Sequence, residues 1–275
     1  VNMEKIDIIT EKLKKEILEL LYHDEMYNAI LIELIQNNTN SLGKLYINKT
    51  EKEITEILHI KNDGNSNFTN FVYTSTDGLK DIAFKIKELN YRKILLAGKL
   101  EDVNSLFKIL GCNKTITPNI FYKLNIEKYK DIHRKYKTKV RLASLNNEDI
   151  DKVKEFTVNF LEAKTEEEIM EVTNDGKILA KMKSGVYLLD YENNPMGMAR
   201  FVGKTDNFSE ITSVYIDKAY RNRGFGKELI GHMIDIAIEE QRTPILATLI
   251  SNVPARKTYE SMGFERQEEY AYEFL

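Results

Sequence analysis

Residues 221–226 combine two arginines with two glycines in the order Arg-Asn-Arg-Gly-Phe-Gly. They follow the apolar stretch Val214 to Ile216 and precede an amphipathic pattern that predicts a helix over residues 226–241. At a helix start, backbone N–H groups and the positive end of the dipole point at one spot, and glycines leave room for a diphosphate there. We expect this turn to bind a pyrophosphate, with Arg221 and Arg223 adding charge. The alternative is a tight strand-to-helix turn with solvated arginines.

A second set of residues follows one helix and one strand later: Asn252, Ala255, Tyr259 and the pair Gly263-Phe264. Together with the glycine-rich turn, it resembles the GNAT family of acetyl-CoA-dependent N-acyltransferases over about Thr138 to Leu275. The resemblance implies that acetyl-CoA is the cosubstrate, that the turn holds its pyrophosphate, and that the preceding strand and Asn252 contact its pantetheine arm. The coenzyme-binding residues implied in this way are Val214, Tyr215, Ile216, Arg221, Asn222, Arg223, Gly224, Phe225, Gly226, Lys227, Asn252 and Ala255.

Two side chains are candidates for moving protons, Tyr259 and Glu210. By resemblance Tyr259 points at the thioester sulfur, and a phenol of pKa near 10 can donate to a thiolate whose thiol has a pKa near 8.5. Glu210 stands in Phe-Ser-Glu-Ile, where some family members place a glutamate base. A base is useful because an alkyl ammonium has a pKa near 10.4. The alternatives are a packed tyrosine and a solvated carboxylate. The backbone N–H of Val214 is implied as the group that polarises the carbonyl.

Strand and helix patterns alternate along the second half, which predicts an α+β fold with an α/β/α-layered, mixed and mostly antiparallel sheet. We expect strands at 140–144, 186–191, 196–202, 209–216, 243–250 and 265–274, with a hairpin turn at 192–195. We expect helices at 147–161, across 165–183, at 226–241 and at 254–262. Gly263 stops the last helix.

The first half repeats part of this order and resembles a degenerate copy of the same domain. Its expected helices are 26–36, 79–89 and 102–110, and its expected strands lie near Leu45 and at 55–60, 68–74, 93–97 and 119–124. Setting Gly111 against Gly263 aligns Phe107 with Tyr259, Val103 with Ala255 and Leu100 with Asn252, so the polar positions are lost. The turn at 74–78 has no cation. We therefore predict tandem GNAT-like domains at 1–130 and 138–275, joined through the polar stretch 126–138. The first would bind no coenzyme and would shape the substrate mouth or stabilise the catalytic half.

Composition excludes several classes of protein. The 275 residues are 42% hydrophobic and 30% charged with a net charge of −3, so there is no positive field to hold a nucleic acid. Tyrosines and lysines interleave at 122–141, but Tyr122, Tyr129 and Tyr136 recur every seven residues and fit one helical face. A single Cys112 and the lack of zinc-ligand spacing indicate a reducing compartment and no metal. With no bilayer-length apolar stretch and no signal peptide, we expect a cytoplasmic protein without a membrane partner.

Together these features predict an N-acetyltransferase. It would move an acetyl or short acyl group from acyl-CoA to a primary amine of a small molecule or peptide, by direct attack in a ternary complex. Candidates for the acceptor pocket are Phe160, Glu162, Tyr187, Arg200 and Phe201, although packing explains the three aromatic residues equally well. Two alternatives stay open: a non-catalytic acyl-CoA-binding regulatory module, and an aminoacyl transferase that uses charged tRNA, against which the near-neutral charge balance counts.

Overall fold

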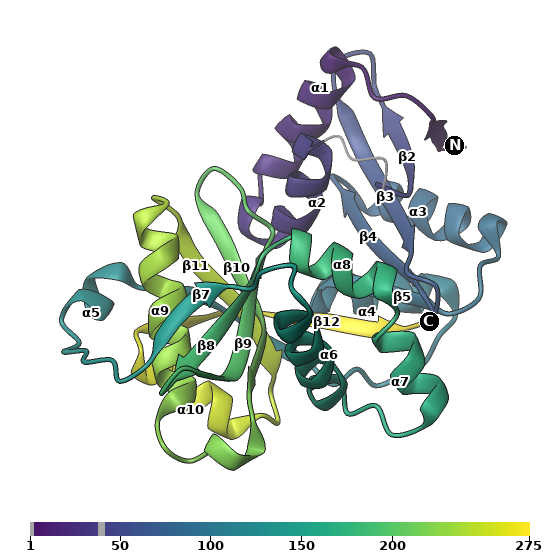
Figure 1. Cartoon of the computed structure of the whole chain (residues 1–275). Coiled ribbons are helices and arrows are strands. Elements are labelled where there is room, and N and C mark those ends of the chain that lie inside the picture. The colour runs from purple at the N-terminus through teal and green to yellow at the C-terminus, as the bar shows by residue number, and fades with distance from the viewer. Residues whose placement is uncertain (1–2, 38–41) are drawn as a thin grey trace.

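The computed structural model describes residues 3–37 and 42–275, and their strands form one mixed sheet in the order β1-β2-β3-β4-β5-β12-β6-β11-β10-β9-β8-β7 (Figure 1). The N-terminal half contains β1 (Glu4–Ile6), α1 (Glu11–Tyr22), α2 (Glu25–Asn37), β2 (Lys44–Lys49), β3 (Ile54–Asn62), β4 (Asn67–Tyr73), α3 (Thr76–Leu89), β5 (Ile94–Lys99), α4 (Leu100–Leu110) and β6 (Asn119–Leu124). After α5 (Ile126–Lys130), the C-terminal half contains β7 (Lys139–Leu142), α6 (Asn147–Leu161), α7 (Glu166–Val172), α8 (Asp175–Lys183), β8 (Val186–Tyr191), β9 (Asn194–Val202), β10 (Phe208–Ile216), α9 (Phe225–Glu239), β11 (Thr243–Leu249), α10 (Val253–Ser261) and β12 (Phe264–Phe274). Among the described strands, only β4–β5 and β10–β11 pair in parallel, so the predicted mostly antiparallel α+β sheet is confirmed.

The last strand of each half is exchanged with the other half. β12 lies between β5 and β6, and β6 lies between β12 and β11. The register sets Tyr272 of β12 opposite Ala97 of β5, and Phe121 of β6 opposite Ala247 of β11. Each half therefore completes its part of the sheet with a strand from the other half, and the limits 1–130 and 138–275 stay a prediction.

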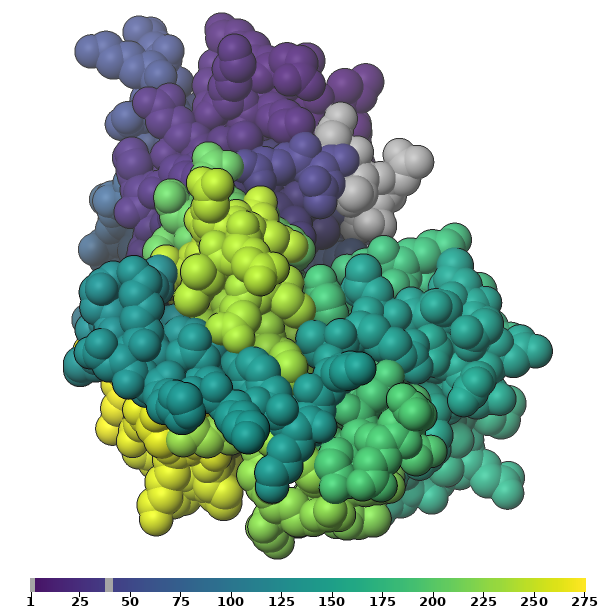
Figure 2. Space-filling view, turned by 60° about the vertical axis from the view of Figure 1, so that its left-hand side comes forward, coloured from purple at the N-terminus to yellow at the C-terminus, as the bar shows by residue number. Residues whose placement is uncertain are grey.

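The segment that joins the halves is anchored on α9. The hydroxyl of Tyr129 donates to one carboxylate oxygen of Asp235 at 2.8 Å, and that of Tyr136 donates to the other at 2.7 Å. Figure 2 shows this teal segment lying across the yellow-green helix. The expectation that Tyr122, Tyr129 and Tyr136 share one helical face is wrong, because they lie on β6, on the short helix α5 and in the following loop. Two of the three tyrosines hold the linker to the C-terminal half.

Strand β10 separates two environments, because successive side chains of a strand point to opposite faces. Ile211 is buried in a core cluster with Leu229 and Met233 of α9. Its neighbour Glu210 points to the other face, toward a cavity lined by residues of α2. One strand thus carries residues for both sides of the sheet.

The observed elements differ from the predicted ones in a few places. The segment 165–183 forms two helices, because the Asn174 side chain accepts from the amide of Gly176 at 3.0 Å and starts α8. The hairpin turn is shorter than predicted, with Glu192 and Asn193 in left-handed conformation and β9 beginning at Asn194. Strand β1 and helices α1 and α5 were not predicted. No helix within residues 3–37 and 42–275 is long and apolar enough to cross a membrane.

Candidate active site

A groove opens where β10 and β11 diverge. The two strands pair in parallel only from Phe208 to Glu210, opposite Thr243 to Ile245. Beyond this point the end of β10, the loop after β11, and helices α6, α9 and α10 enclose a groove of about 360 Å³. Its lining residues are Asn159, Phe160, Glu162, Val214, Tyr215, Ile216, Arg221, Gly226, Ile230, Asn252, Pro254, Ala255, Thr258 and Tyr259. The structure thus brings Tyr259 together with many of the residues predicted to bind the coenzyme.

A β-bulge in β10 shapes one wall of the groove. The pairing with β9 shifts register between Thr212 and Tyr215, and Ser213 has a φ of 53°. Tyr215 packs on Phe156 of α6, with ring centroids 5.4 Å apart. Val214 has no register partner in β9 or β11, so its backbone N–H lies outside the described ladders. This is the amide predicted to polarise the acyl carbonyl.

The start of α9 is an open anion-binding position. Gly224 is the N-cap with a φ of 83°, and no side chain caps the helix. Within the described part of the chain, the amides of Phe225 and Gly226 donate to no acceptor. A Cβ added to Gly224 would meet nothing within 4 Å, and one added to Gly226 would meet only Ile216, at 3.9 Å. The space in front of two unpaired amides is free of protein, which fits the diphosphate of coenzyme A.

The two arginines of the turn take different positions. Arg221 lines the groove, where its Nε donates to the carbonyl of Ile216 at 3.0 Å. The guanidinium of Arg223 lies 5.0 Å from the ring centroid of Phe225 and 5.6 Å from those of Tyr191 and Tyr220. Arg223 is not among the groove-lining residues, and neither are Asn222 and Lys227. Of the predicted cations, Arg221 is therefore the one positioned in the groove.

Asn252 has a structural role and a free donor. Its side-chain oxygen accepts from the amide of Ala255 at 3.3 Å and caps α10. Its side-chain nitrogen has no acceptor among the described residues, and the side chain lines the groove. An amide nitrogen that faces an open groove without an acceptor is available to a ligand carbonyl such as those of a pantetheine arm.

Tyr259 reaches the groove from α10 and is 9% exposed. Its ring contacts those of Tyr122 and Phe264 edge-on, with centroids 6.1 and 6.0 Å away. Burial, and after it the proximity of Tyr122, raises the pKa of Tyr259 to about 12. The phenol is therefore neutral at physiological pH, and its hydroxyl has no hydrogen-bond partner in the described residues. The Tyr259 hydroxyl can therefore donate a hydrogen bond or a proton to a ligand in the groove.

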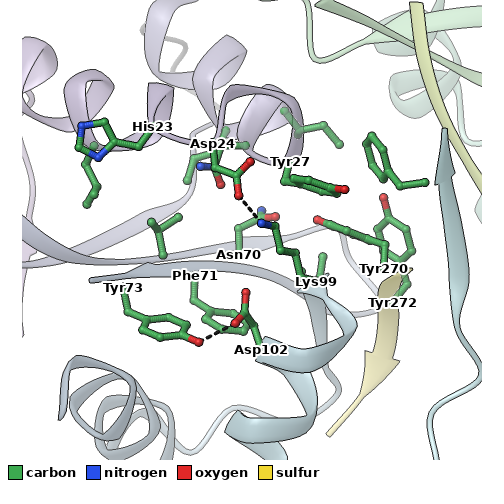
Figure 3. A pocket seen from close by; sticks show the side chains of 18 of the residues that line it. His23, Asp24, Tyr27, Asn70, Phe71, Tyr73, Lys99, Asp102, Tyr270 and Tyr272 are labelled. Carbon is green, nitrogen blue, oxygen red and sulfur yellow. Dashed lines mark hydrogen bonds and ion pairs between the residues drawn. The ribbon is translucent and has the colours of Figure 1, made fainter. Parts of the chain in front are cut away.

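Glu210, the predicted base, does not line this groove. It is 7% exposed and lines a separate cavity of about 440 Å³ beneath α2 (Figure 3). Burial, followed by the charge of Glu33, raises the pKa of Glu210 to about 7. Because β10 stops pairing with β11 at Glu210, this carboxyl stands where the sheet opens. Tyr259 and Glu210, the two residues predicted to transfer protons, thus line different sites: Tyr259 the groove and Glu210 the cavity.

The predicted acceptor-pocket residues divide between three places. Phe160 and Glu162 line the groove. Tyr187 and Phe201 pack edge to face at 5.7 Å in the core under α9, so packing explains them. Arg200 donates to the Ser184 hydroxyl at 3.0 Å. Within the described part of the chain, no group of three or more His, Cys, Asp and Glu side chains could hold a metal ion.

Sequence reasoning missed the cavity residues that come from the N-terminal half. Tyr27 of α2, Lys99 of β5 and Asp102 of α4 share the cavity with Glu210, although more than 100 residues separate them from it. No local sequence pattern predicts that these residues line the same cavity. The exchange of β6 and β12 creates it by joining the two halves into one sheet.

Comparisons with known proteins agree with the fold and the groove described above. Residues 150–264 match the family model "Acetyltransferase (GNAT) family", whereas no curated protein matches the chain. A tandem GNAT protein from the clavulanic acid biosynthesis pathway has a similar structure, with a TM-score of 0.68, 9% identity, and 98% of this chain and 97% of that chain covered. An acetyltransferase of the GNAT family from Colwellia psychrerythraea gives a TM-score of 0.60 at 12% identity, with both chains covered in full. A GCN5-related N-acetyltransferase from Sphaerobacter thermophilus gives 0.61 at 11% identity, with 98% and 94% covered.

The family model covers the groove, the uncapped start of α9 and Tyr259, which together support acyl transfer from acyl-CoA. Residues 150–264 are similar to the GNAT acetyltransferase family, and the chain as a whole has the fold of two tandem GNAT domains.

Proposed function

We propose that this protein is an N-acetyltransferase that moves an acetyl or short acyl group from acyl-CoA to a primary amine of a small molecule or peptide. The amine attacks directly in a ternary complex, without a covalent enzyme intermediate. One observation carries the proposal: the unpaired amides at the start of α9 and the unpaired hydroxyl of Tyr259 belong to the same part of the molecule, at the groove that β10 and β11 open.

The groove residues account for coenzyme binding. The amides of Phe225 and Gly226, with Arg221 beside them, hold the diphosphate. The edge of β10 at 214–216 that faces away from β9, where the pairing with β11 has ended, and the side-chain nitrogen of Asn252 hold the pantetheine arm. When bound, the coenzyme supplies a thioester-activated acyl group. The N–H of Val214 then donates to the acyl carbonyl oxygen, which gains negative charge during attack.

Tyr259 stabilises the leaving sulfur. As the amine nitrogen forms its bond to the acyl carbon, the carbon–sulfur bond breaks and the sulfur gains charge. A phenol with a pKa of about 12 is a weaker acid than the thiol it serves. The main contribution of Tyr259 is therefore a hydrogen bond from its hydroxyl to the departing sulfur. The phenol keeps its proton, and coenzyme A leaves as a thiolate that takes up a proton from solvent.

Glu210 accepts the proton that the amine must lose. With a pKa of about 7, its carboxyl is largely ionised above neutral pH and is a much stronger base than an ordinary carboxylate. In this proposal the amine lies in the cavity beside Glu210, at the end of the β10–β11 pairing, and reaches an acyl group on the groove side between the diverging strands. We assign Glu210 as the base on this arrangement.

A thiol-release assay with acetyl-CoA over a panel of primary amines, combined with calorimetric titration of the coenzyme, tests the proposal. We expect micromolar binding and release of free thiol only when an amine is present. Tight binding with no amine-dependent release from any member of the panel would instead identify a non-catalytic acyl-CoA-binding module. Absence of coenzyme binding would overturn both functions.

A further inference from the structure

A second cavity lies at the seam of the two halves, separate from the coenzyme groove. Residues of α2, β4 and β5 from the N-terminal half line it together with Phe121 of β6, Tyr270 of β12 and Glu210 of β10. It shares no lining residue with the groove. Its volume of about 440 Å³ suits a small organic ligand.

The charge of this cavity is negative. Its lining includes the carboxyl groups of Asp24, Asp102 and Glu210, but only one ammonium group, that of Lys99. Lys99 is already neutralised by Asp24 at 2.6 Å (Figure 3) and by Glu268 at 2.8 Å. Asp102 accepts one hydrogen bond, from Tyr73 at 2.5 Å, and meets no cation among the described residues. A cationic ligand would balance this excess of carboxylates.

Aromatic rings form the other wall. Tyr27 stacks on Tyr270 with the ring planes 8° apart and lies 4.9 Å from Phe121, and Tyr272 follows Tyr270 at 5.0 Å. The ammonium of Lys99 sits 4.6 Å from the centroid of the Tyr27 ring. The cavity thus already holds one ammonium against an aromatic face, which is a favourable contact for organic cations.

We infer that this cavity is the acceptor site, and that it selects a small cationic amine without a carboxylate group. The inference rests on the proposed function and names its substrate class. The ammonium nitrogen lies among the carboxyl groups of Glu210 and Asp102, and the carbon chain lies against the rings of Tyr27 and Tyr270. A carboxylate on the acceptor would be placed among like charges, which is unfavourable. The N-terminal half, which lost the coenzyme turn, then serves acceptor recognition.

A pair of probes that differ by one group tests the charge selection. Pentylamine and 5-aminopentanoate have the same chain and the same amine, and they differ in a terminal carboxylate. Titrated into the full-length protein with coenzyme A present, pentylamine should bind at least tenfold more tightly. Equal affinities, or tighter binding of 5-aminopentanoate, would overturn the inference.

Substitution then tests the place of binding. Asp102→Asn keeps an acceptor for the Tyr73 hydroxyl but removes the charge, and it should raise the KM or Kd for pentylamine about fivefold while the affinity for coenzyme A is unchanged. Glu101→Gln is the matched control, because Glu101 is the exposed neighbour on the same helix and does not line the cavity. Tyr27→Leu, which removes the ring and keeps apolar bulk, should also weaken pentylamine binding.

These results separate the two proposals. If pentylamine binds in an Asp102-dependent way but no amine releases thiol from acetyl-CoA, the acetyltransferase assignment fails and the amine site stands. If acetyl transfer proceeds but neither Asp102→Asn nor Tyr27→Leu changes the KM for the amine in a folded variant, the acceptor lies elsewhere and the inference fails. Circular dichroism and the melting temperature establish that each variant is folded.

Discussion

Helices α3 and α9 begin at equivalent points of the two halves, after strands β4 and β10, but their first turns differ in one respect that matters for anions. At α3, the Ser75 side chain accepts from the amide of Gly78 at 3.1 Å. The carboxylate of Glu56 also occupies this end, since a Cβ added to Gly78 would lie 2.1 Å from its oxygen. At α9, no side chain caps the helix, and the first-turn carboxylate of Glu228 accepts from the amides of Lys137 and Thr138. In the described part of the chain, no carboxylate lies within 4 Å of a Cβ added to Gly224 or Gly226. The chain itself fills the anion position in one half and leaves it open in the other.

The helices that follow, α4 and α10, show the same division. Both end at a glycine in left-handed conformation, Gly111 with φ 81° and Gly263 with φ 93°. Phe107 and Tyr259 occupy matching buried positions, but only Tyr259 carries a hydroxyl. The features that the two halves share are those that packing and helix termination require. The features that differ are those that a bound coenzyme would require, which is why one half can keep the fold without the ligand.

The largest effect should come from closing the open turn. Gly224→Val places a branched side chain in front of the amides of α9, and we expect coenzyme affinity to fall more than 100-fold. Gly111→Val is a closely matched control, because Gly111 has a similar φ of 81° and its Cβ would also meet nothing within 4 Å. Both variants should lose about 1–2 kcal/mol of stability to backbone strain. Calorimetric titration and thermal melting measure the two effects, and equal coenzyme affinity in both variants would contradict the assignment of the turn.

Glu210 should give the next largest effect. Glu210→Gln should lower turnover about 100-fold at pH 8. In the unmodified protein, turnover should rise with pH through about 7, where this carboxyl ionises. Glu33→Gln, which removes the charge that raises the pKa of Glu210, should move that rise to lower pH. A full rate and an unchanged pH profile in the Glu210→Gln variant would rule out its role as base.

The carboxyl group of Glu210 also makes the free energy of unfolding depend on pH. Its folded pKa of about 7 lies above the ordinary value of 4.5, so the stabilising protonation is complete below about pH 4 and is lost as the pH rises through 7. Glu210→Gln should therefore increase the free energy of unfolding at pH 8, by at most about 3 kcal/mol, and change it little at pH 4. Urea unfolding at the two pH values measures this difference. The phenols of Tyr270 and Tyr272 and the carboxylate of Glu33 share its surroundings, and burial and the charge of Glu33 both disfavour ionised Glu210.

Tyr259→Phe should lower kcat about tenfold and leave the Kd for acetyl-CoA unchanged, because a hydrogen bond to the leaving sulfur forms only during reaction. Tyr122→Phe is its control, since that hydroxyl bonds Glu260 at 2.7 Å and faces the same aromatic cluster. The reverse change in the other half, Phe107→Tyr, should create no activity and should cost about 1–3 kcal/mol by burying a hydroxyl. An unchanged kcat in the Tyr259→Phe variant would remove its assigned role.

The smallest effect concerns the two arginines of the turn. Arg221→Gln should weaken coenzyme binding about fivefold, because Arg221 lines the groove. Arg223→Gln should weaken it less than twofold, because its guanidinium rests on Tyr191, Tyr220 and Phe225. Titrations at two salt concentrations check this order, and a larger loss with Arg223→Gln would show that the side chain turns toward the ligand on binding.

Local patterns predicted the elements of the C-terminal half well. Helix α6 spans Asn147 to Leu161 as expected, because its Asn146 cap and its apolar spacing are both encoded within a few residues. Helix α1 was missed although the signal existed, with Thr10 as cap and Ile17, Leu20 and Leu21 on one buried face. The breaks at Asn174 and Asn193 were missed because they depend on a cap and on backbone conformation rather than on hydrophobic spacing.

The long-range features could not be predicted in this way. The alternation of apolar and polar residues along a strand indicates which face is buried, but not which strand lies beside it. The exchange of β6 and β12 between the halves therefore could not be predicted from this pattern. The β-bulge at Ser213 could not be predicted either, because no glycine marks it. The cavity that holds Glu210 follows from the exchange, since its other wall comes from residues of the N-terminal half.

Hydrogen–deuterium exchange of the full-length protein with and without coenzyme A tests most directly whether one half alone binds the coenzyme. We predict slower exchange on addition of coenzyme A in peptides covering residues 221–230 and 250–260, and unchanged exchange in peptides covering residues 74–80. Protection of residues 74–80, or no protection of residues 221–230 at saturating coenzyme A, would contradict the single open site at α9.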